Sequence, residues 1–188
     1  IVVNGVDVAS RTPVQMAQQV AVVGQHPADM FCAQSVREEI GFGPRALGVD
    51  DDEVARRVNE MVRLFDLYDV EDMPAGALSS GEQRAVALAC ALVMHAPVLV
   101  LDEPAAGLDH RLKSRLLNTV ARMNREGTTV IIATEDADLI QRYCSHAARL
   151  DQGRLVSYGR VRANGRRFLA PPPVQGVRAA SNGKGVAR

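Results

Sequence analysis

Apolar residues occur along this chain in short blocks, and the spacing inside each block indicates the element that it forms. The block Val98-Leu99-Val100-Leu101 is continuous, with no polar residue alternating in it. Such an unbroken run is typical of a parallel strand that is covered by helices on both faces. Similar blocks at Val20–Val23 and Thr128–Ala133 predict two further strands. Together the three blocks predict the core of a parallel sheet.

Between these blocks, apolar residues recur with the period of a helix. The segment that begins at Asp50-Asp51-Asp52 collects five of them on one face: Val54, Val58, Met61, Val62 and Phe65. Arg111–Arg125 predicts a second amphipathic helix, which Gly127 follows, with these residues turned inward: Leu112, Leu116, Val120 and Met123. Residues 84–94 are apolar nearly all round and predict a buried helix. Strands that alternate with helices predict an α/β fold.

Turn and cap residues predict the shorter elements. Asn4-Gly5 lies between Ile1–Val3 and Val6–Val8 and predicts a β-hairpin. Thr12-Pro13 predicts the start of a short helix that reaches about Gln19. Ser35 predicts the cap of another helix, which we expect to end at the break Gly41-Phe42-Gly43-Pro44. A hairpin near the end of the chain is predicted by Ala147–Leu150, Gln152-Gly153 and Leu155–Tyr158.

Composition narrows the class of protein. The 188 residues suffice for one ordinary core with a small insertion. Lysine plus arginine and aspartate plus glutamate number 22 each, so no overall basic field favours nucleic acid. Cys32, Cys90 and Cys144 are widely spaced and are expected to be reduced thiols. The sequence contains no secretory signal and no apolar run near the ~20 residues of a membrane span, which predicts a cytoplasmic protein.

The last residues differ in composition from the rest. Residues 161–188 carry arginines and Lys184 with no acidic counterweight, and Pro171-Pro172-Pro173 adds little that could form a core. Such a segment is predicted to be disordered. The alternative is a basic tail that contacts acidic lipid or a partner.

The central strand leads directly into two carboxylates, Asp102 and Glu103. In open α/β sheets, ligands bind beyond the carboxyl ends of the strands. One carboxylate there can hold hydrated Mg²⁺, and its neighbour can orient or deprotonate an attacking water. Gln25 follows the Val20–Val23 strand, where its amide can meet a ligand or metal. The simpler alternatives are an acidic turn and an ordinary loop glutamine.

Ser79-Ser80-Gly81-Glu82 comes directly before the buried helix. A serine here caps the helix, and Gly81 allows another backbone to approach closely. The first N–H groups of such a helix form an anion site that suits phosphate. An ordinary capping box explains the same residues without any ligand.

Read in order, these segments resemble the nucleotide-binding domain of ATP-binding cassette (ABC) ATPases. The resemblance covers residues 1–160 and implies a P-loop NTPase (RecA-like) parallel-sheet core, residues 1–24 and 96–160, with an inserted α-helical subdomain, residues 25–95. It implies a Q-loop at Gln25 and a signature motif at residues 79–82, both contacting ATP. It further implies Mg²⁺ binding by Asp102 and Gln25, a general base at Glu103, and a nucleotide-contacting D-loop residue, Asp109.

A narrower likeness lies after the Q-loop. Gln25-His26-Pro27, Phe31, Val36-Arg37-Glu38-Glu39-Ile40 and Gly41-Phe42-Gly43-Pro44 resemble the energy-coupling factor importers, which take up cobalt, nickel or vitamins. The resemblance implies ATP and Mg²⁺ as cofactors, and a second ABC ATPase domain, in trans or fused, as one partner. It also implies an integral membrane transport subunit, no nucleic acid, and a peripheral place on the cytoplasmic face of the cell membrane.

The sequence departs from this family in two respects. No G-x-x-x-x-G-K-[ST] phosphate loop is present, and neither lysine of the chain, Lys113 or Lys184, stands in one. The family places that loop before the first hairpin, so we expect an amino-terminally truncated domain. Glu135 stands where the family usually has a histidine that contacts the γ-phosphate. We therefore expect the catalytic position at Glu135 to be degenerate and the chain's own half-site to be weak.

Two other interpretations remain open at this stage. One is a non-transport ABC ATPase that acts on DNA or ribosomes. The short segment between Gln25 and Leu78 leaves no room for the long coiled coils of such proteins. The other is an inactive partial ABC domain that acts only as a binding module.

Overall fold

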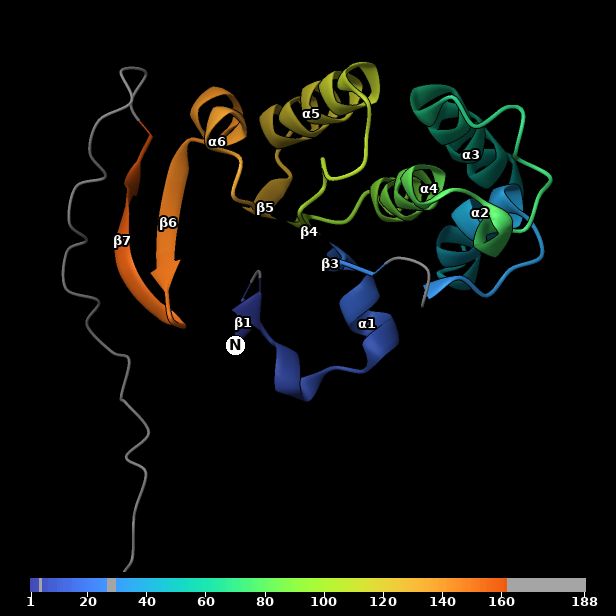
Figure 1. The fold of residues 1–188 in the computed structure, drawn as a ribbon. Coiled ribbons are helices and arrows are strands. Elements are labelled where there is room, and N and C mark those ends of the chain that lie inside the picture. The colour runs from blue at the N-terminus through green and yellow to red at the C-terminus, as the bar shows by residue number, and fades with distance from the viewer. Residues whose placement is uncertain (4, 27–29, 162–188) are drawn as a thin grey trace, which may run out of the picture. The chain divides into compact units, whose positions relative to one another are not determined.

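The computed structural model describes residues 1–3, 5–26 and 30–161 (Figure 1). They fall into two compact units that meet in sequence at Glu135 and Asp136, and each unit is described by itself. The predicted disorder of the basic tail concerns residues outside this description, except for Val161. None of the helices in the described ranges has the length and apolar character needed to cross a membrane.

A three-stranded parallel sheet forms the centre of the first unit. Its strands are β3 (Val20–Val23), β4 (Val98–Asp102) and β5 (Thr129–Ala133), in the order β3-β4-β5. All three lie where the apolar blocks predict them. Val23 pairs with Leu101, and Asp102 pairs with Ala133. The carboxyl ends of the strands therefore lie at one edge of the sheet.

The two faces of this sheet are covered differently. Four side chains of one face are buried: Ala21, Val23, Leu99 and Leu101. On the other face, Val22 is 53% exposed and Ile131 is 55% exposed. Val100, half-buried, pairs with both of them. Within the described residues, the prediction of helices on both faces of Val98–Leu101 thus holds for the face of Leu99 and Leu101, whereas the face of Val100 is partly open to solvent.

Three helices pack together after β3 and bury most of their apolar residues. They are α2 (Val36–Ala46), α3 (Asp51–Phe65) and α4 (Ser80–Leu92), and the short η3 (Ala75–Ala77) precedes α4. The buried residues of α3 are the five that its periodicity predicts. Helix α4 is buried along most of its length, as its composition predicts. These helices share one continuous core with the sheet.

Helix α2 runs through Gly41-Phe42-Gly43-Pro44, so the prediction that it ends there is wrong. Pro44 lies in the last turn, and the helix continues for only two residues beyond it. The loss of one backbone donor near a helix end removes a single intrahelical bond. The glycines serve close packing instead, because a Cβ on Gly43 would lie 2.5 Å from Met94 Sδ.

The first residues form the predicted hairpin and short helix. Strands β1 (Val2–Val3) and β2 (Val6–Asp7) pair antiparallel, and η1 (Val8–Ser10) follows them. Thr12 caps α1 (Pro13–Ala17) through a capping box with Gln15, and Pro13 occupies the first turn. The helix ends at Ala17, before the expected Gln19.

Helix α5 (His110–Arg125) follows the central strand and buries Leu116, Leu117 and Val120. Leu112 and Met123 are half-buried, and Gly127 has a positive φ of 110° just beyond the helix. The predicted amphipathic helix is therefore confirmed. Glycine at this position permits a backbone conformation that other residues rarely adopt.

The second unit begins with α6 (Ala137–Tyr143) and continues in the predicted hairpin of β6 (His146–Asp151) and β7 (Arg154–Arg160). The ring of His146 stacks on Tyr158, with centroids 5.9 Å apart. This contact gives His146 a structural role in the hairpin.

The three cysteines are free thiols, as their spacing predicts. Burial on α4 raises the pKa of Cys90 to about 12. Because the thiolate is the reactive form, Cys90 is chemically inert at neutral pH.

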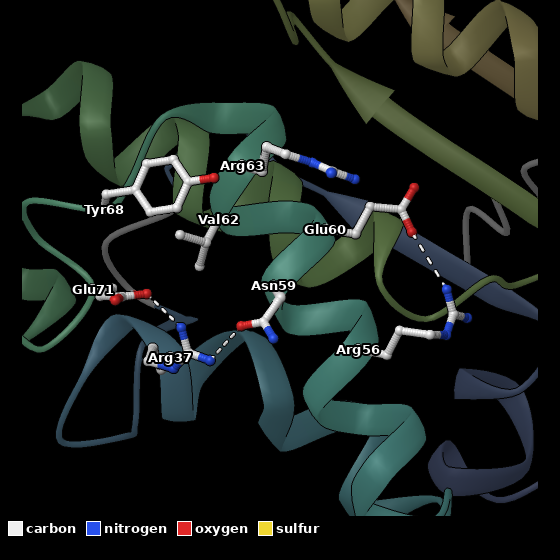
Figure 2. Close-up of a pocket in the computed structure, with 8 residues that line it drawn as sticks. All are labelled: Arg37, Arg56, Asn59, Glu60, Val62, Arg63, Tyr68 and Glu71. Atoms are coloured by element: carbon white, nitrogen blue, oxygen red, sulfur yellow. Dashed lines mark hydrogen bonds and ion pairs between the residues drawn. The ribbon is translucent and has the colours of Figure 1, made fainter.

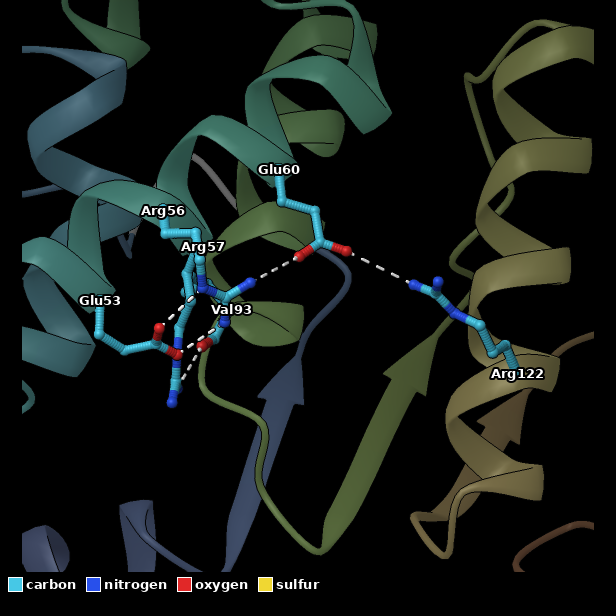
Figure 3. Close-up of polar contacts among 6 residues, drawn as sticks. All are labelled: Glu53, Arg56, Arg57, Glu60, Val93 and Arg122. Carbon is cyan, nitrogen blue, oxygen red and sulfur yellow. Dashed lines mark hydrogen bonds and ion pairs between the residues drawn. The ribbon is translucent and has the colours of Figure 1, made fainter.

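Charged residues join α3 to α5 across the surface of the first unit (Figure 3). Glu53 pairs with Arg56 and with Arg57, while Glu60 pairs with Arg56 and with Arg122 of α5. Asp66 and Arg111 form a further pair between the two helices. Hydrogen bonds from Arg56, and then from Arg57, lower the pKa of Glu53 to about 2.

Substitution of Phe65 by alanine tests the core that α3 builds. Phe65 is 2% exposed, so Phe65→Ala is expected to lower the free energy of unfolding by about 3–5 kcal/mol. Phe42 is 56% exposed on α2, and Phe42→Ala is expected to change it by no more than about 0.5 kcal/mol. Urea unfolding followed by circular dichroism measures both. Equal losses in the two variants would contradict this packing.

The low pKa of Glu53 predicts a pH dependence of stability. A carboxyl group whose pKa is about 2 when folded, against 4.5 ordinarily, stabilises the fold above pH 4.5. That contribution disappears as the pH falls from 4.5 to about 2. Thermal unfolding of wild type and Glu53→Gln should therefore differ at pH 6 and converge near pH 2. Glu126→Gln, at an exposed position, is the control, and a constant difference for Glu53→Gln at all pH values would refute the prediction.

Candidate functional site

The carboxyl edge of the parallel sheet gathers most of the polar residues singled out in the sequence. Gly24 and Gln25 follow β3, Asp102 ends β4, and Thr134 and Glu135 follow β5. Since Leu101 pairs with Val23 and Asp102 with Ala133, these residues leave the sheet at the same level. The structure thus brings Gln25, Asp102, Glu103 and Glu135 to one edge.

Glu103 has an unusual backbone conformation at this edge. Its φ is 44°, in the left-handed region, and its N–H donates to the carbonyl of Ala133 at 2.9 Å. For a residue other than glycine this conformation costs free energy, so it persists only where the surrounding structure imposes it. The turn that follows is closed by a hydrogen bond from the Ala106 N–H to the Glu103 carbonyl, 3.1 Å long.

The side chain of Glu103 is held by the end of the neighbouring strand. Its Oε2 accepts a hydrogen bond from Thr134 Oγ1 at 3.0 Å, and its Oε1 accepts one from the N–H of Glu135 at 2.8 Å. Glu135 therefore contacts Glu103 through its backbone, while its own side chain is exposed. These two donors fix the orientation of the Glu103 carboxylate. The sequence patterns did not single out Thr134 as a site residue.

Asp102 and Gln25 leave their side chains free at the same edge. Neither side chain has a hydrogen-bond or ion-pair partner within residues 1–3, 5–26 and 30–161, and Gln25 is exposed. Carboxylate and amide oxygens suit Mg²⁺, which often takes one or two protein ligands and fills its shell with phosphates and water. No group of three or more His, Cys, Asp and Glu side chains in the described part could hold a metal. A carboxylate and an amide oxygen at this edge have the chemistry of Mg²⁺ ligands, with phosphate and water oxygens to complete the shell.

The start of α4 is a capping box. Ser79 Oγ accepts from the Glu82 N–H at 3.4 Å, and the Glu82 carboxylate accepts from the Ser79 N–H at 2.9 Å and from the Ser79 hydroxyl. These hydrogen bonds, led by the one from the hydroxyl, hold the pKa of Glu82 below its ordinary value. The first N–H groups of the helix, those of Ser80 and Gly81, point out of the helix end, as in any α-helix. Both the capping and the anion-site interpretations therefore remain compatible with this geometry.

Gly81 brings this helix end against the loop that follows the acidic strand. A Cβ at Gly81 would lie 3.0 Å from the backbone oxygen of Gly107, which leaves little room for a side chain. Two residues further on, Asp109 caps α5, and its Oδ1 accepts from the Leu112 N–H at 2.8 Å. The predicted D-loop residue thus has a structural partner, and it remains exposed.

Arg84 contacts this edge from the second turn of α4, and sequence reasoning missed it. Its guanidinium donates to the carbonyls of Gly24, Gln25 and Asp102. No local pattern could identify this role, because all three acceptors are backbone atoms of distant residues. The only signal was a position shortly after the residues of the signature motif.

A cavity of the first unit lies elsewhere, against α3 (Figure 2). It has a volume of about 470 Å³, and none of the predicted site residues lines it. Arg37 there pairs with Glu71 and donates to Asn59 Oδ1 at 2.6 Å, while Arg56 pairs with Glu60. Most of the charged residues that line the cavity thus pair with one another, so the cavity does not resemble a nucleotide site.

Comparison with known proteins identifies the family of the chain. Residues 1–106 match the ABC transporter family. The chain is 37% identical over 161 residues to an ABC transporter ATP-binding protein of Methanothermobacter marburgensis, covering 85% of this chain and 58% of that protein. It is 36% identical over 146 residues to the energy-coupling factor transporter ATP-binding protein EcfA of Methanocaldococcus jannaschii, covering 78% and 52%. The chain thus spans between half and three fifths of the length of these relatives.

Solved structures give the same result for the fold. CbiO1 of Clostridium perfringens, part of the ABC transporter complex CbiONQ, aligns with a TM-score of 0.63 at 33% identity, over 78% of this chain and 59% of that one. A dimeric ATP-binding cassette bound to ADP and Pi aligns with a TM-score of 0.76 at 18% identity, over 85% and 72%. The P-loop NTPase fold is therefore confirmed. With its strand order, its acidic sheet edge and these likenesses, the chain belongs to the ABC transporter family.

Proposed function

We propose that this chain is part of an ATP-hydrolysing subunit, or of a fused half, that energises an ABC importer of the energy-coupling factor type. The observation that carries the proposal is the Glu103 carboxylate, oriented by Thr134 and Glu135 beside the free side chain of Asp102. That arrangement is what water activation next to a metal-bound phosphate requires. Relatives named EcfA, and CbiO1, support the transporter class.

In the proposed reaction, water attacks the γ-phosphorus of ATP and the bond to the β–γ bridging oxygen breaks. Glu103 accepts the proton of the attacking water, since its carboxylate is fixed at the strand end. Asp102 and Gln25 would hold Mg²⁺, which neutralises charge on the phosphate oxygens when bound. Ser79, Ser80, Gly81 and Glu82 form the end of α4 that offers N–H donors to a phosphate.

We propose a second ABC ATPase domain and an integral membrane transport subunit as partners, which places the chain peripherally on the cytoplasmic face of the cell membrane. In the dimeric arrangement, the α4 end of one cassette completes the nucleotide site of the other, and Asp109 lies near the same interface. The cargo class is cobalt, nickel or a vitamin, on the likeness to the energy-coupling factor importers.

We further propose that the nucleotide half-site on this chain is catalytically weak, while its α4 completes the partner's site. Glu135 stands where the family usually has a histidine that contacts the γ-phosphate, and its side chain is exposed at the sheet edge. A carboxylate that is about 4 Å from a phosphate charge is repelled by roughly 4 kcal/mol at an effective dielectric of ~20. The capping box at Ser79 is, by contrast, intact.

The two roles can be separated in the full-length protein assembled with its partner cassette. Ser79→Arg places a bulky cation at the α4 end and is expected to lower ATP turnover by about 10²-fold, as when donors to a transition state are lost. Glu103→Gln is expected to change turnover little. A phosphate-release assay measures both.

Ser35→Arg, which removes the cap of another helix, is the control for lost capping. It should leave turnover near that of wild type. If Glu103→Gln abolishes turnover while Ser79→Arg is harmless, this division of roles is wrong.

The same proposal predicts weak nucleotide binding by the 188-residue chain alone. Backbone N–H groups and the lysine of a phosphate loop supply most of the grip on the β- and γ-phosphates. Isothermal titration of ATP with Mg²⁺ is therefore expected to show no binding in the micromolar range. A micromolar Kd would contradict the prediction and would require another phosphate cradle in this chain.

A further inference from the structure

Arg84 joins three parts of the first unit through one guanidinium. Its Nη1 donates to the carbonyl of Gly24 at 3.2 Å and to that of Asp102 at 3.3 Å, and its Nη2 donates to the carbonyl of Gln25 at 2.8 Å. Gly24 and Gln25 follow β3, whereas Asp102 ends β4. A side chain of α4 therefore holds the ends of two adjacent strands at a fixed separation.

The chemistry of these contacts leaves the functional atoms free. All three acceptors are backbone oxygens, so Arg84 does not occupy the Asp102 carboxylate or the Gln25 amide. Carbonyls at the end of a strand lose their sheet partners and need other donors. The planar guanidinium, with five N–H groups in a fixed fork, can serve several of them at once.

The position of Arg84 on α4 connects this edge with the predicted signature motif. Ser79 caps the same helix, and Gly81 in its first turn lies against the Gly107 oxygen. Ser79 and Arg84 are less than two turns apart on this 13-residue helix, and over so short a distance an α-helix moves as a rigid element. Any displacement of its first turn therefore reaches the backbone of Gln25 and Asp102 through Arg84.

Helix α2 holds the backbone just before its own start. Glu39 of α2 is 7% exposed, and its Oε2 accepts from the N–H groups of Cys32 at 2.8 Å and Ala33 at 2.7 Å. Helices α2 and α4 pack against each other in the same core. Arg84 of α4 and Glu39 of α2 thus tie the backbone of residues 24–25 and of residues 32–33 to the helical part of the unit.

We propose that Arg84 is a positioning residue for ATP hydrolysis. It sets the backbone of Gln25 and Asp102, and so the placing of their side chains for Mg²⁺, and it transmits the position of α4 to that site. This inference rests on the proposed ATPase function. Removal of the guanidinium should impair metal placement and turnover more than nucleotide affinity.

The test uses the full-length ATPase assembled with a partner cassette whose own catalytic carboxylate is replaced by glutamine, so that the measured turnover comes from the half-site of this chain. Arg84→Lys and Arg84→Met are compared with wild type. The matched control is Arg115→Met, on the exposed side of α5. For Arg84→Met, kcat is expected to fall by roughly 10–100-fold, as for residues that orient metal ligands, and the KM for ATP should change less than about threefold. Arg84→Lys keeps the charge but loses the fork, so an intermediate kcat is expected.

A second measurement separates positioning from folding. Mn²⁺ replaces Mg²⁺, and electron paramagnetic resonance gives its affinity in the presence of a non-hydrolysable ATP analogue. Arg84→Met should weaken Mn²⁺ binding by about tenfold or more, with Arg84→Lys intermediate and Arg115→Met unchanged. Unfolding by urea shows how far each variant is destabilised.

The outcomes are distinct. If wild type hydrolyses ATP and Arg84→Met keeps its kcat and Mn²⁺ affinity within twofold, the positioning role is refuted. It is also refuted if kcat falls only in step with stability, without a change in Mn²⁺ affinity and without partial rescue by lysine. If the wild-type chain assembled with an unaltered partner cassette shows no hydrolysis, the proposed function fails, and this inference fails with it.

Discussion

The alignment of the three parallel strands is the constraint on which the rest of this structure depends. Because Val23, Leu101 and Ile132 pair across the sheet, the next residues of each strand emerge together at one edge. A shift of one residue would turn Asp102 to the other face and would move the buried Leu99 and Leu101 out of the core. The energy of the core therefore fixes the position of the acidic residues, with no contribution from any ligand. The site is in this sense a consequence of how the apolar blocks pair.

The edge defined in this way is electrostatically demanding. Asp102, Glu103 and Glu135 lie at the ends of neighbouring strands. The guanidinium of Arg84 contacts the same strand ends, but it donates to backbone carbonyls and not to the carboxylates. The Glu103 carboxylate is stabilised by a hydroxyl and an N–H, which orient it without neutralising it. A polyphosphate approaching such an edge meets like charge, so it needs a divalent cation between itself and the carboxylates. The chemistry of the proposed site follows from that requirement.

The sequence allowed the sheet and the amphipathic helices to be predicted, because their apolar periodicity reports local burial. The inward face of α3 is the clearest case, with Val54 to Phe65 placed correctly. The end of α2 was mispredicted because Pro44 in a last turn costs little, and a glycine can serve close packing as well as a turn. Among the site residues, the strand-end acids could be predicted from their position after apolar runs. Arg84 and Thr134 could not, because their partners are distant in the sequence. The carbonyls that Arg84 contacts lie 18 to 60 residues away, and Glu103 lies 31 residues from Thr134.

The open apolar face of the sheet and its acidic edge both require a further structural element. Val22, Val100 and Ile131 form an apolar row across all three strands, and in the described residues this row has no helix over it. Exposed apolar rows of this kind mark a surface that another element covers. The acidic edge of the same sheet needs a cation and phosphate-binding N–H groups. A glycine-rich loop that continues into a helix supplies both, since its helix packs on the sheet while its lysine and N–H groups reach the edge. The apolar row thus gives a structural reason, independent of any sequence motif, to expect the nucleotide cradle on this face.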